Sequence, residues 1–469
     1  MMRARARLSF RDPRERPPLP RVRMIGGRVD RRLYYLGCAL VVASILFHLP
    51  LLLVAGCALL LVLAATDIWA RYCLHSVDYQ RHFSSQRALF GEEITFAISL
   101  ENAKLLPLSW LELDDTLPRG LTFKGYPVRS GLTSNKVSLE CLFSLRWYER
   151  VIRRYSIQCT NRGIHAFGPA TLRSGDVFGF LSREMRIEAI QYVLVYPLVV
   201  PLSSFPLPSR HPFGERRAPR RLLEDPARVA GVREYVYGDS MRRIDWKATA
   251  RTMTLQSRVY EASTTYTLML FLNTTNQLDA YYGVHPELQE LAICVAASVS
   301  SWALDQGYAV GLYANSIMSM PDDTDTPRVT QELEMEARQA AAQLKRRRIR
   351  LPAASSEEQR QRIMEVLARV QSYFGTSIED VLLAERTHLP LGSTVVVITS
   401  TISEVLADTL LRMRQDGHAV SILFVGDAPP PVKLAGTTIY HLGGEAAWNE
   451  LKASHIDLEE SGTATGFHL

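Results

Sequence analysis

Residues 231–251, GVREYVYGDSMRRIDWKATAR, combine acidic, basic and aromatic side chains more densely than any other stretch of the chain. Between positions 233 and 261 there are six basic and four acidic residues. A phosphate or nucleic-acid site needs Lys and Arg without opposing acids, and a phosphate loop is also rich in glycine. The near balance of charge therefore favours ion pairs inside a structural joint over a phosphate clamp.

The local pattern of this stretch predicts a turn followed by a short helix over residues 240–250. Asp239 or Ser240 is the expected N-terminal cap. Ile244 and Ala248 are four residues apart and should face inward, and Trp246 should cover a neighbouring patch. A buried Trp246 would contribute several kcal/mol to stability. The alternating residues 253–261 then predict a strand.

From residue 265 onward, short apolar runs alternate with amphipathic segments, a pattern typical of a doubly wound α/β sheet with helices on both faces. The expected strands are 265–273, 308–314, 393–400 and 418–426, and the expected helices are 286–307, 357–374 and 402–417. Ligands of such sheets bind at the carboxyl ends of the strands. Here these ends are residues 273–277 and 399–403.

An almost uncharged run over residues 33–69 predicts a membrane anchor. Because Pro50 interrupts the run, two short helices over 33–48 and 51–69 fit it better than a single tilted span. Residues 1–32 contain eleven Arg. The positive-inside rule then keeps both ends of the hairpin in the cytoplasm, with Arg71, Arg81 and Arg87 in agreement. One span with an exported domain is the alternative.

The rest of the chain shows two further kinds of composition. Period-two alternation, as in EEITFAISLEN, predicts an antiparallel sandwich, and the Pro- and Arg-rich segment after it predicts an extended linker. The six Cys form no C-x-x-C pair, so no zinc site or disulfide framework is expected. The expected parts are an Arg-rich cytoplasmic N-terminus (1–32), a transmembrane hairpin (33–70), a β-sandwich-like domain (77–200), a basic linker (201–232), an α/β domain (233–445) and a C-terminal tail (446–469).

The opening stretch resembles the signature of the domain of unknown function 58 family, R-E-Y-x-x-G-D-x-x-R-x-I-x-W-K-x-x-A-R. The fixed positions are Arg233, Glu234, Tyr235, Gly238, Asp239, Arg242, Ile244, Trp246, Lys247, Ala250 and Arg251, and Asp245 lies among them. The resemblance implies a von Willebrand factor A-like α/β domain on a membrane-anchored accessory protein. It also implies genes for a MoxR-type AAA+ ATPase and a transglutaminase-like membrane protein nearby.

One feature departs from that resemblance. Von Willebrand factor A domains bind a divalent cation through D-x-S-x-S after their first strand, and a hard cation needs anionic oxygens. Here the loop carries Asn273, Thr275 and Gln277, and a later loop carries Thr399 and Ser400. Because the carboxylates are missing, no metal is expected, and these residues become candidates for a degenerate metal site that contacts a partner.

These observations predict a non-enzymatic scaffold in the inner (cytoplasmic) membrane, multi-pass, with its soluble domains facing the cytoplasm. Its expected partners are the MoxR-type ATPase, the transglutaminase-like protein and membrane lipid, without nucleic acid or cofactor. No nucleophile elbow or H-E-x-x-H motif is found, so no catalytic residue is expected. The alternatives are a hydrolase of unknown substrate, a cation-dependent protein-binding domain, or lipid or nucleic-acid binding by the basic segments.

Overall fold

The computed structural model of this protein divides between Val195 and Tyr196 into two compact units. It describes residues 22–26, 31–47, 49–124, 129–130, 136–176, 181–207, 224–237, 239–262, 266–275, 285–319, 348–371, 376–390, 392–430, 434 and 436–460. Most of the Arg-rich start and the last nine residues therefore lie outside the described residues.

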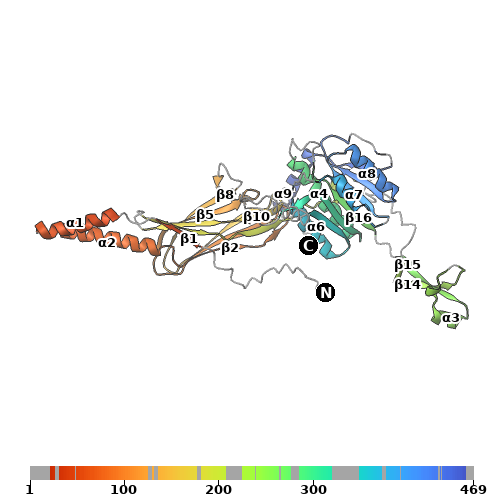
Figure 1. Ribbon diagram of the computed structural model, residues 1–469, viewed down its shortest axis with the longest axis horizontal. Coiled ribbons are helices and arrows are strands. Elements are labelled where there is room, and N and C mark those ends of the chain that lie inside the picture. The colour runs from red at the N-terminus through yellow and green to blue at the C-terminus, as the bar shows by residue number, and fades with distance from the viewer. Residues whose placement is uncertain are drawn as a thin grey trace, which may run out of the picture. The chain divides into compact units, whose positions relative to one another are not determined.

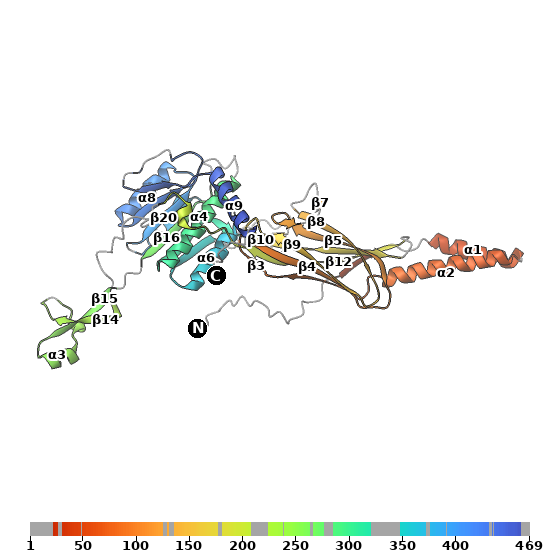
Figure 2. The same cartoon turned by 180° about the vertical axis from the view of Figure 1, so that it is seen from behind.

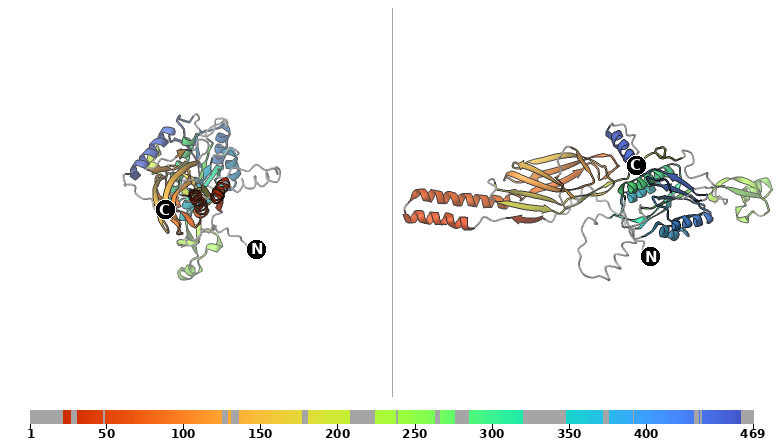
Figure 3. Two further views of the ribbon diagram at one scale, coloured as in Figure 1. Left: turned by 90° about the vertical axis from the view of Figure 1, so that its left-hand side faces the viewer. Right: turned by 90° about the horizontal axis from the view of Figure 1, so that it is seen from above.

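Two helices form the hairpin, α1 (Arg31–Phe47) and α2 (Pro50–Tyr72), and they lie side by side in Figures 1 and 3. Pro50 begins α2 because its missing N–H needs no partner in a first turn. A Cβ on Gly56 would lie 3.1 Å from the backbone nitrogen of Val41, so the absent side chain lets the helices approach closely. The two predicted helices are confirmed. By length and composition, α2 is the one described helix that qualifies as a candidate membrane span.

The described remainder of the first unit consists mainly of antiparallel β-structure, as the alternating pattern predicts, with one parallel pair, β3 and β13. In β4 (Glu93–Asn102) the side chains of Ile94, Phe96, Ile98 and Leu100 are buried. In β8 (Lys136–Leu145) the inward side chains end at Leu145, and Trp147 is exposed beyond the strand end.

The described strands of this unit form three sheets, with orders β1-β12-β11-β5-β8-β7, β2-β4-β9-β6 and β10-β13-β3. Figure 2 shows these strands together at one end of the hairpin. Their remaining bounds are β1 (Val22–Gly26), β2 (Val77–Phe83), β3 (Arg87–Ala88), β5 (Leu108–Pro118), β6 (Thr122–Lys124), β7 (Arg129–Ser130), β9 (Arg150–Gln158), β10 (Gly163–Phe167), β11 (Ala170–Gly175), β12 (Ser182–Ile187) and β13 (Gln191–Val195).

A buried ion pair joins two of these sheets. The side chains of Arg81 on β2 and Asp115 on β5 are 2% and 0% exposed. Arg81 donates from Nη2 to Oδ1 of Asp115 at 2.6 Å and from Nε to Oδ2 at 2.9 Å. The hydroxyl of Tyr79 donates to the same carboxylate at 2.6 Å, and its pKa is raised well above the ordinary value by burial and by this negative charge. Arg81 is therefore a core residue. It gives less support to a cytoplasmic orientation than the sequence alone suggested.

The second unit contains the doubly wound sheet that the alternating pattern predicts. Its order is β18-β17-β16-β20-β21-β22, in which β17, β16, β20, β21 and β22 run parallel and β18 is antiparallel. The strands are β16 (Thr267–Leu272), β17 (Ala309–Met318), β18 (Arg348–Ala354), β20 (Thr394–Thr399), β21 (Ala419–Phe424) and β22 (Thr438–His441), with the short β19 (Val370–Gln371) paired to β17.

Helices cover both faces of this sheet (Figure 2). On one face α4 (Pro286–Asp305) packs against α6 (Glu357–Ala368) and α9 (Glu445–Glu460). On the other, α7 (Ile378–Glu385) and α8 (Glu404–Gln415) cover a core that includes Phe271 and Val397. The expected strands and helices from residue 265 onward are confirmed in order, except that the helix expected over 357–374 ends at Ala368 and is followed by the short strand β19. The elements β18, α7, β22 and α9 were not anticipated.

Three boundaries differ from those predicted. The first unit ends at Val195 rather than 200, and the amide of Val200 donates to Oγ of Ser298 on α4 at 3.0 Å. Residues 224–234, expected in part as linker, form the strand β14. The expected tail instead begins with α9, where Trp448 is buried.

We expect Asp115→Ala to lower the free energy of unfolding by about 3–5 kcal/mol, because it leaves the buried Arg81 guanidinium without its counterion. Thermal melting of the full chain in detergent measures this loss. Asp114→Ala is the matched control, since Asp114 is exposed on the same strand and should cost less than about 0.5 kcal/mol. Equal melting temperatures for both variants would contradict the structural role of the pair.

Candidate functional site

Polar side chains stand in a row across three neighbouring parallel strands, at the carboxyl ends of β16 and β20 and within β17, which continues to Met318. Leu272 pairs in register with Ala314 and Ile398, so the next residues, Asn273, Asn315 and Thr399, lie side by side. Residues two apart on a strand share a face, and these three continue the apolar stripes of Phe271, Tyr313 and Val397. We call Asn273, Asn315 and Thr399 the polar row.

Hydrogen bonds connect the polar row internally. Asn273 donates from Nδ2 to Oγ1 of Thr399 at 3.0 Å and accepts at Oδ1 from Nδ2 of Asn315 at 2.8 Å. The amide nitrogens of Thr274 and Thr275 donate to Oδ1 of Asn315 and Asn273 at 2.8 and 3.0 Å. All three members of the row are buried, and a buried amide without partners is costly. The network therefore closes the strand ends without an ion.

The structure brings together Asn273, Thr275 and Thr399 as the sequence suggested, and it adds Asn315. The signal for Asn315 was present, because it directly follows the expected strand 308–314. Ser400 is adjacent, but its buried Oγ has no hydrogen-bond partner among the residues that the structure describes. Gln277 lies outside them.

The polar row contains amides and hydroxyls and no carboxylate, thiol or imidazole. Over the described ranges, no group of three or more His, Cys, Asp or Glu side chains could hold a metal ion. The row can donate and accept hydrogen bonds, but it offers a dication no anionic oxygen. Because its side chains are buried and paired with one another, the row holds the neighbouring strands together.

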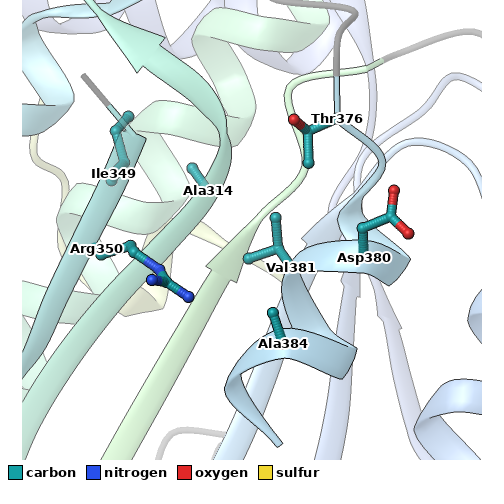
Figure 4. A pocket seen from close by; sticks show the side chains of 7 residues that line it. All are labelled: Ala314, Ile349, Arg350, Thr376, Asp380, Val381 and Ala384. Carbon is teal, nitrogen blue, oxygen red and sulfur yellow. The ribbon is translucent and has the colours of Figure 1, made fainter. Parts of the chain in front are cut away.

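A hollow of about 270 Å³ lies at the same edge of the sheet, beside Ala314. Figure 4 shows Arg350 and Asp380 on opposite sides of it, with Val381 and Ala384 of α7 between them. Arg350 also forms an ion pair with Glu385. The volume is below that of most small-molecule sites.

The signature residues belong to a separate two-stranded element, the signature ribbon, which consists of β14 (Glu224–Glu234), β15 (Gln256–Ala262) and the segment between them. Two ion pairs hold that segment. Arg233 donates from Nη2 to Oδ1 of Asp239 at 2.8 Å, and Arg258 donates from Nε to Oδ2 of Asp245 at 3.0 Å. The expectation of mutually paired charges thus agrees with these two contacts.

The helix of the ribbon differs from the expected one. Residues 241–243 form a 3-10 turn, and α3 (Trp246–Thr252) begins only after Asp245. Oδ1 of Asp245 accepts from the amides of Lys247 and Ala248 at 3.0 and 3.1 Å, so Asp245 is the cap, rather than Asp239 or Ser240. These amides and Arg258 hold the pKa of Asp245 below its ordinary value.

The aromatic residues of the ribbon correct a second expectation. Trp246 is 69% exposed and Tyr237 is 100% exposed, so Trp246 does not belong to a core. Ile244 is buried, as expected. Met241 and Met253 are also exposed. The ion pairs therefore shape the ribbon, and its large apolar side chains lie on the surface.

The other signature residues have simpler surroundings. The hydroxyl of Tyr235 donates to the carbonyl of Asp239 at 3.3 Å. Glu234, Lys247 and Arg251 are exposed. Gly238 and the side chain of Arg242 lie outside the part of the chain that the structure describes.

We expect Asn273→Ala to destabilise the protein by about 1–3 kcal/mol, because Asn315 and Thr399 lose a buried partner. Thermal melting of the full chain measures this effect, and Asn449→Ala, at an exposed position of α9, is the control. A melting temperature of Asn273→Ala equal to that of the parent would show that water replaces the amide without cost.

We expect protection of the α3 amides from hydrogen exchange to fall at neutral pH in the order parent, Asp245→Asn, Asp245→Ala. Asn retains the cap but loses the ion pair with Arg258, and Ala loses both. Because folding lowers the pKa of Asp245, the charge contributes stability above the ordinary carboxyl pKa of about 4, and this contribution is lost as pH falls through the lowered value.

The difference in amide protection between the parent and Asp245→Asn should accordingly disappear in acid. The difference between Asp245→Asn and Asp245→Ala should persist. Exchange of the parent and both variants, compared at each pH by mass spectrometry, tests this. Equal protection in Asn and Ala would contradict the capping role.

Comparisons with known proteins give one curated relative and a set of distant structural matches. The relative is "Uncharacterized protein YeaD" of Bacillus subtilis (strain 168), which is 25% identical over 245 residues, or 52% of this chain and 57% of that protein. The match thus spans a little over half of the relative's length.

Solved structures similar to parts of the chain include three small domains. They are the C-terminal domain of wzt (7% identity, TM-score 0.19, 26% of this chain and 73% of that chain), the CARDB domain of the PF1109 protein from Pyrococcus furiosus (8%, 0.17, 26% and 96%) and a cohesin from Archaeoglobus fulgidus (12%, 0.18, 26% and 91%). TM-scores this low do not establish a shared fold.

A family model matches residues 231–427, which include the signature ribbon and the strands that carry the polar row. The match agrees with the signature residues found in the sequence. Residues 231–427 of this chain are thus similar to the family described as "Protein of unknown function DUF58".

Proposed function

We propose that this protein is a membrane-anchored, non-enzymatic adaptor that binds protein partners through its second unit. The observation that carries the proposal is the closure of the polar row by Asn273 and Asn315, which gives the sheet edge hydrogen-bonding groups without an ion or a nucleophile. Because these groups are buried and already paired, the edge keeps its shape whether or not a cation is present, and a partner binds the exposed residues around it.

The sheet itself supports a von Willebrand factor A-like domain. Numbered along the chain, its six strands have the order 3-2-1-4-5-6, and the third is antiparallel. In such sheets the carboxyl edge is the binding edge, and here the polar row and the hollow beside Ala314 both lie on it. The alternative of a hydrolase has less support, because the row lacks an acid, a base and a nucleophile.

The signature ribbon supplies the second contact surface of the proposed adaptor. Trp, Tyr and Met are enriched at protein interfaces, and Trp246, Tyr237, Met241 and Met253 are all exposed. Single exposed apolar residues are common, but four within seventeen positions form an unusual concentration. We assign to this ribbon the docking of the partner.

The family resemblance suggests which partners to test and where the protein resides. A MoxR-type AAA+ ATPase is the first candidate, and a transglutaminase-like membrane protein is the second. In this proposal α1 and α2 form a multi-pass anchor in the inner membrane, and the β-strands of the first unit and the whole second unit face the cytoplasm. The apolar composition of α2 supports the anchor, whereas the orientation rests on the sequence rule.

We expect the full chain in detergent to capture a MoxR-type ATPase from the same organism, and Trp246→Ala to weaken capture at least tenfold. Loss of a central aromatic contact has effects of this size. Because Trp246 is largely exposed, the variant should melt like the parent. Val405→Ala, which removes an exposed apolar side chain from α8, should bind normally.

The same capture with Mg²⁺ or with a chelator separates the adaptor from a cation-dependent domain. Capture by the parent should be unchanged by either addition, since the polar row is already satisfied. Loss of the complex on chelation would contradict the ion-independent site. Failure to capture the ATPase from an extract that contains it would contradict the proposed partner.

A further inference from the structure

Three buried hydrogen-bond donors occur where α2 meets the sandwich. They are Nε1 of Trp69, Nζ of Lys104 and Nε of Arg183, and for none of them does the structure place a hydrogen-bond partner among the described residues. We call these three side chains the donor cluster. Leaving one buried donor unpaired costs about 1–3 kcal/mol, and charged groups cost more. Three together are therefore a strong sign of an acceptor that binds from outside the chain.

Several contacts bring the donor cluster to one place. The end of α2 contacts β11 and β12, and β12 carries Arg183. Trp69 packs against the core of the sandwich. The amide of Cys73, the next residue after α2, donates to the carbonyl of Trp69 at 2.8 Å, so Trp69 and Cys73 lie one turn apart on the same side of the helix.

Electrostatics place the other two members beside Cys73. Burial raises the pKa of the Cys73 thiol, and the positive charges of Lys104 and Arg183 both act to lower it. Both side chains are therefore close enough to Cys73 to influence its ionisation. Burial in turn lowers the pKa of Lys104 to about 8. Among the described residues, no carboxylate offsets the effect of burial on the pKa of Lys104.

The surface around the donor cluster has the composition of a membrane interface. The amide of Tyr148 donates to the carbonyl of Lys104 at 3.3 Å, and Tyr148, Trp147 and Leu105 are exposed. Tyr72, at the end of α2, is exposed as well. Trp and Tyr concentrate at the depth of lipid headgroups, where the end of a membrane-spanning α2 would lie.

A phosphate group fits this arrangement better than a carboxylate. Its several oxygens can accept from diverging donors at once, and both ammonium and guanidinium groups bind it well. The phosphate of a membrane lipid reaches this depth with its acyl chains in the bilayer, beside the apolar side chains just described.

We propose that Trp69, Lys104 and Arg183 form a binding site for the phosphate of an anionic membrane phospholipid. The inference rests on the membrane anchoring of the proposed function and is independent of the protein partner. It assigns to the end of α2 a lipid contact that fixes the sandwich against the headgroup layer.

The experiment uses the full chain in detergent, delipidated and then titrated with phosphatidylglycerol or phosphatidylcholine, with bound lipid counted by native mass spectrometry. We expect phosphatidylglycerol to bind at least tenfold more tightly than phosphatidylcholine. Lys104→Met should abolish that preference, and Lys104→Arg should retain most of it. Lys124→Met is the matched control, because Lys124 lies on the same unit near Glu93, away from the donor cluster.

Two further measurements keep the test decisive. Inorganic phosphate is added as a competitor, and if it binds the delipidated protein at millimolar concentration and displaces phosphatidylglycerol, the source is free phosphate and the lipid assignment is overturned. If Lys104→Met fails to fold, the parent is labelled with an amine-reactive reagent near pH 8. Bound phosphatidylglycerol should then slow labelling of Lys104 severalfold, because a phosphate raises its pKa.

Equal binding of both lipids, or labelling of Lys104 that phosphatidylglycerol leaves unchanged, would overturn the proposal. These outcomes are distinct from failure of the adaptor role, which is measured by ATPase capture and by Trp246→Ala. A protein that binds the lipid but not the ATPase would retain this site and lose the proposed partner.

Discussion

The candidate binding edge depends on one requirement, that the polar groups at the carboxyl end of the central strand β16 find hydrogen-bond partners. Parallel strands that end side by side leave polar groups at one buried edge, and each of those groups needs a partner. In this chain the side-chain amide of Asn273 is that partner. Its nitrogen donates to Thr399 on one neighbouring strand, and its oxygen accepts from Asn315 on the other. An amide can do both because it donates and accepts, whereas a carboxylate only accepts. The edge is thus held by hydrogen bonds that do not depend on an ion.

In the signature ribbon, ion pairs and backbone hydrogen bonds hold an irregular surface segment in one conformation. Asp239 and Asp245 each accept from backbone amides and from one arginine, so two carboxylates organise a turn and a helix start. Because these contacts are at the surface, each contributes little alone. Their combined effect is to present Trp246 and Tyr237 to solvent in a defined arrangement.

The first unit contains buried charged groups of two kinds, those with a hydrogen-bond partner and those without one among the described residues. Arg81 is fully matched by Asp115, Tyr79 and the carbonyl of Ala189, to which its Nη1 donates at 2.7 Å. Lys104 and Arg183, at the end of α2, keep buried nitrogens without a partner in the described part of the chain. A charge that is matched inside the protein stabilises one packing arrangement, and a charge that is left unmatched marks a place where something else binds. This contrast separates the structural ion pair from the proposed lipid site.

The sequence alone determined the parts of this protein that repeat a strong local pattern. The break at Pro50, the period-two strands such as β4, and the alternation of β16, α4 and β17 all follow from spacing that the chain itself carries. The signature residues identified the family for the same reason, since their order is local. Only the tertiary structure decided which side chains meet. Asn315 joins Asn273 across forty-two positions, and Arg81 finds Asp115 across thirty-four. It also placed Trp246 on the surface, because burial depends on whether a second element packs over a residue, and no spacing within a single short helix contains that information.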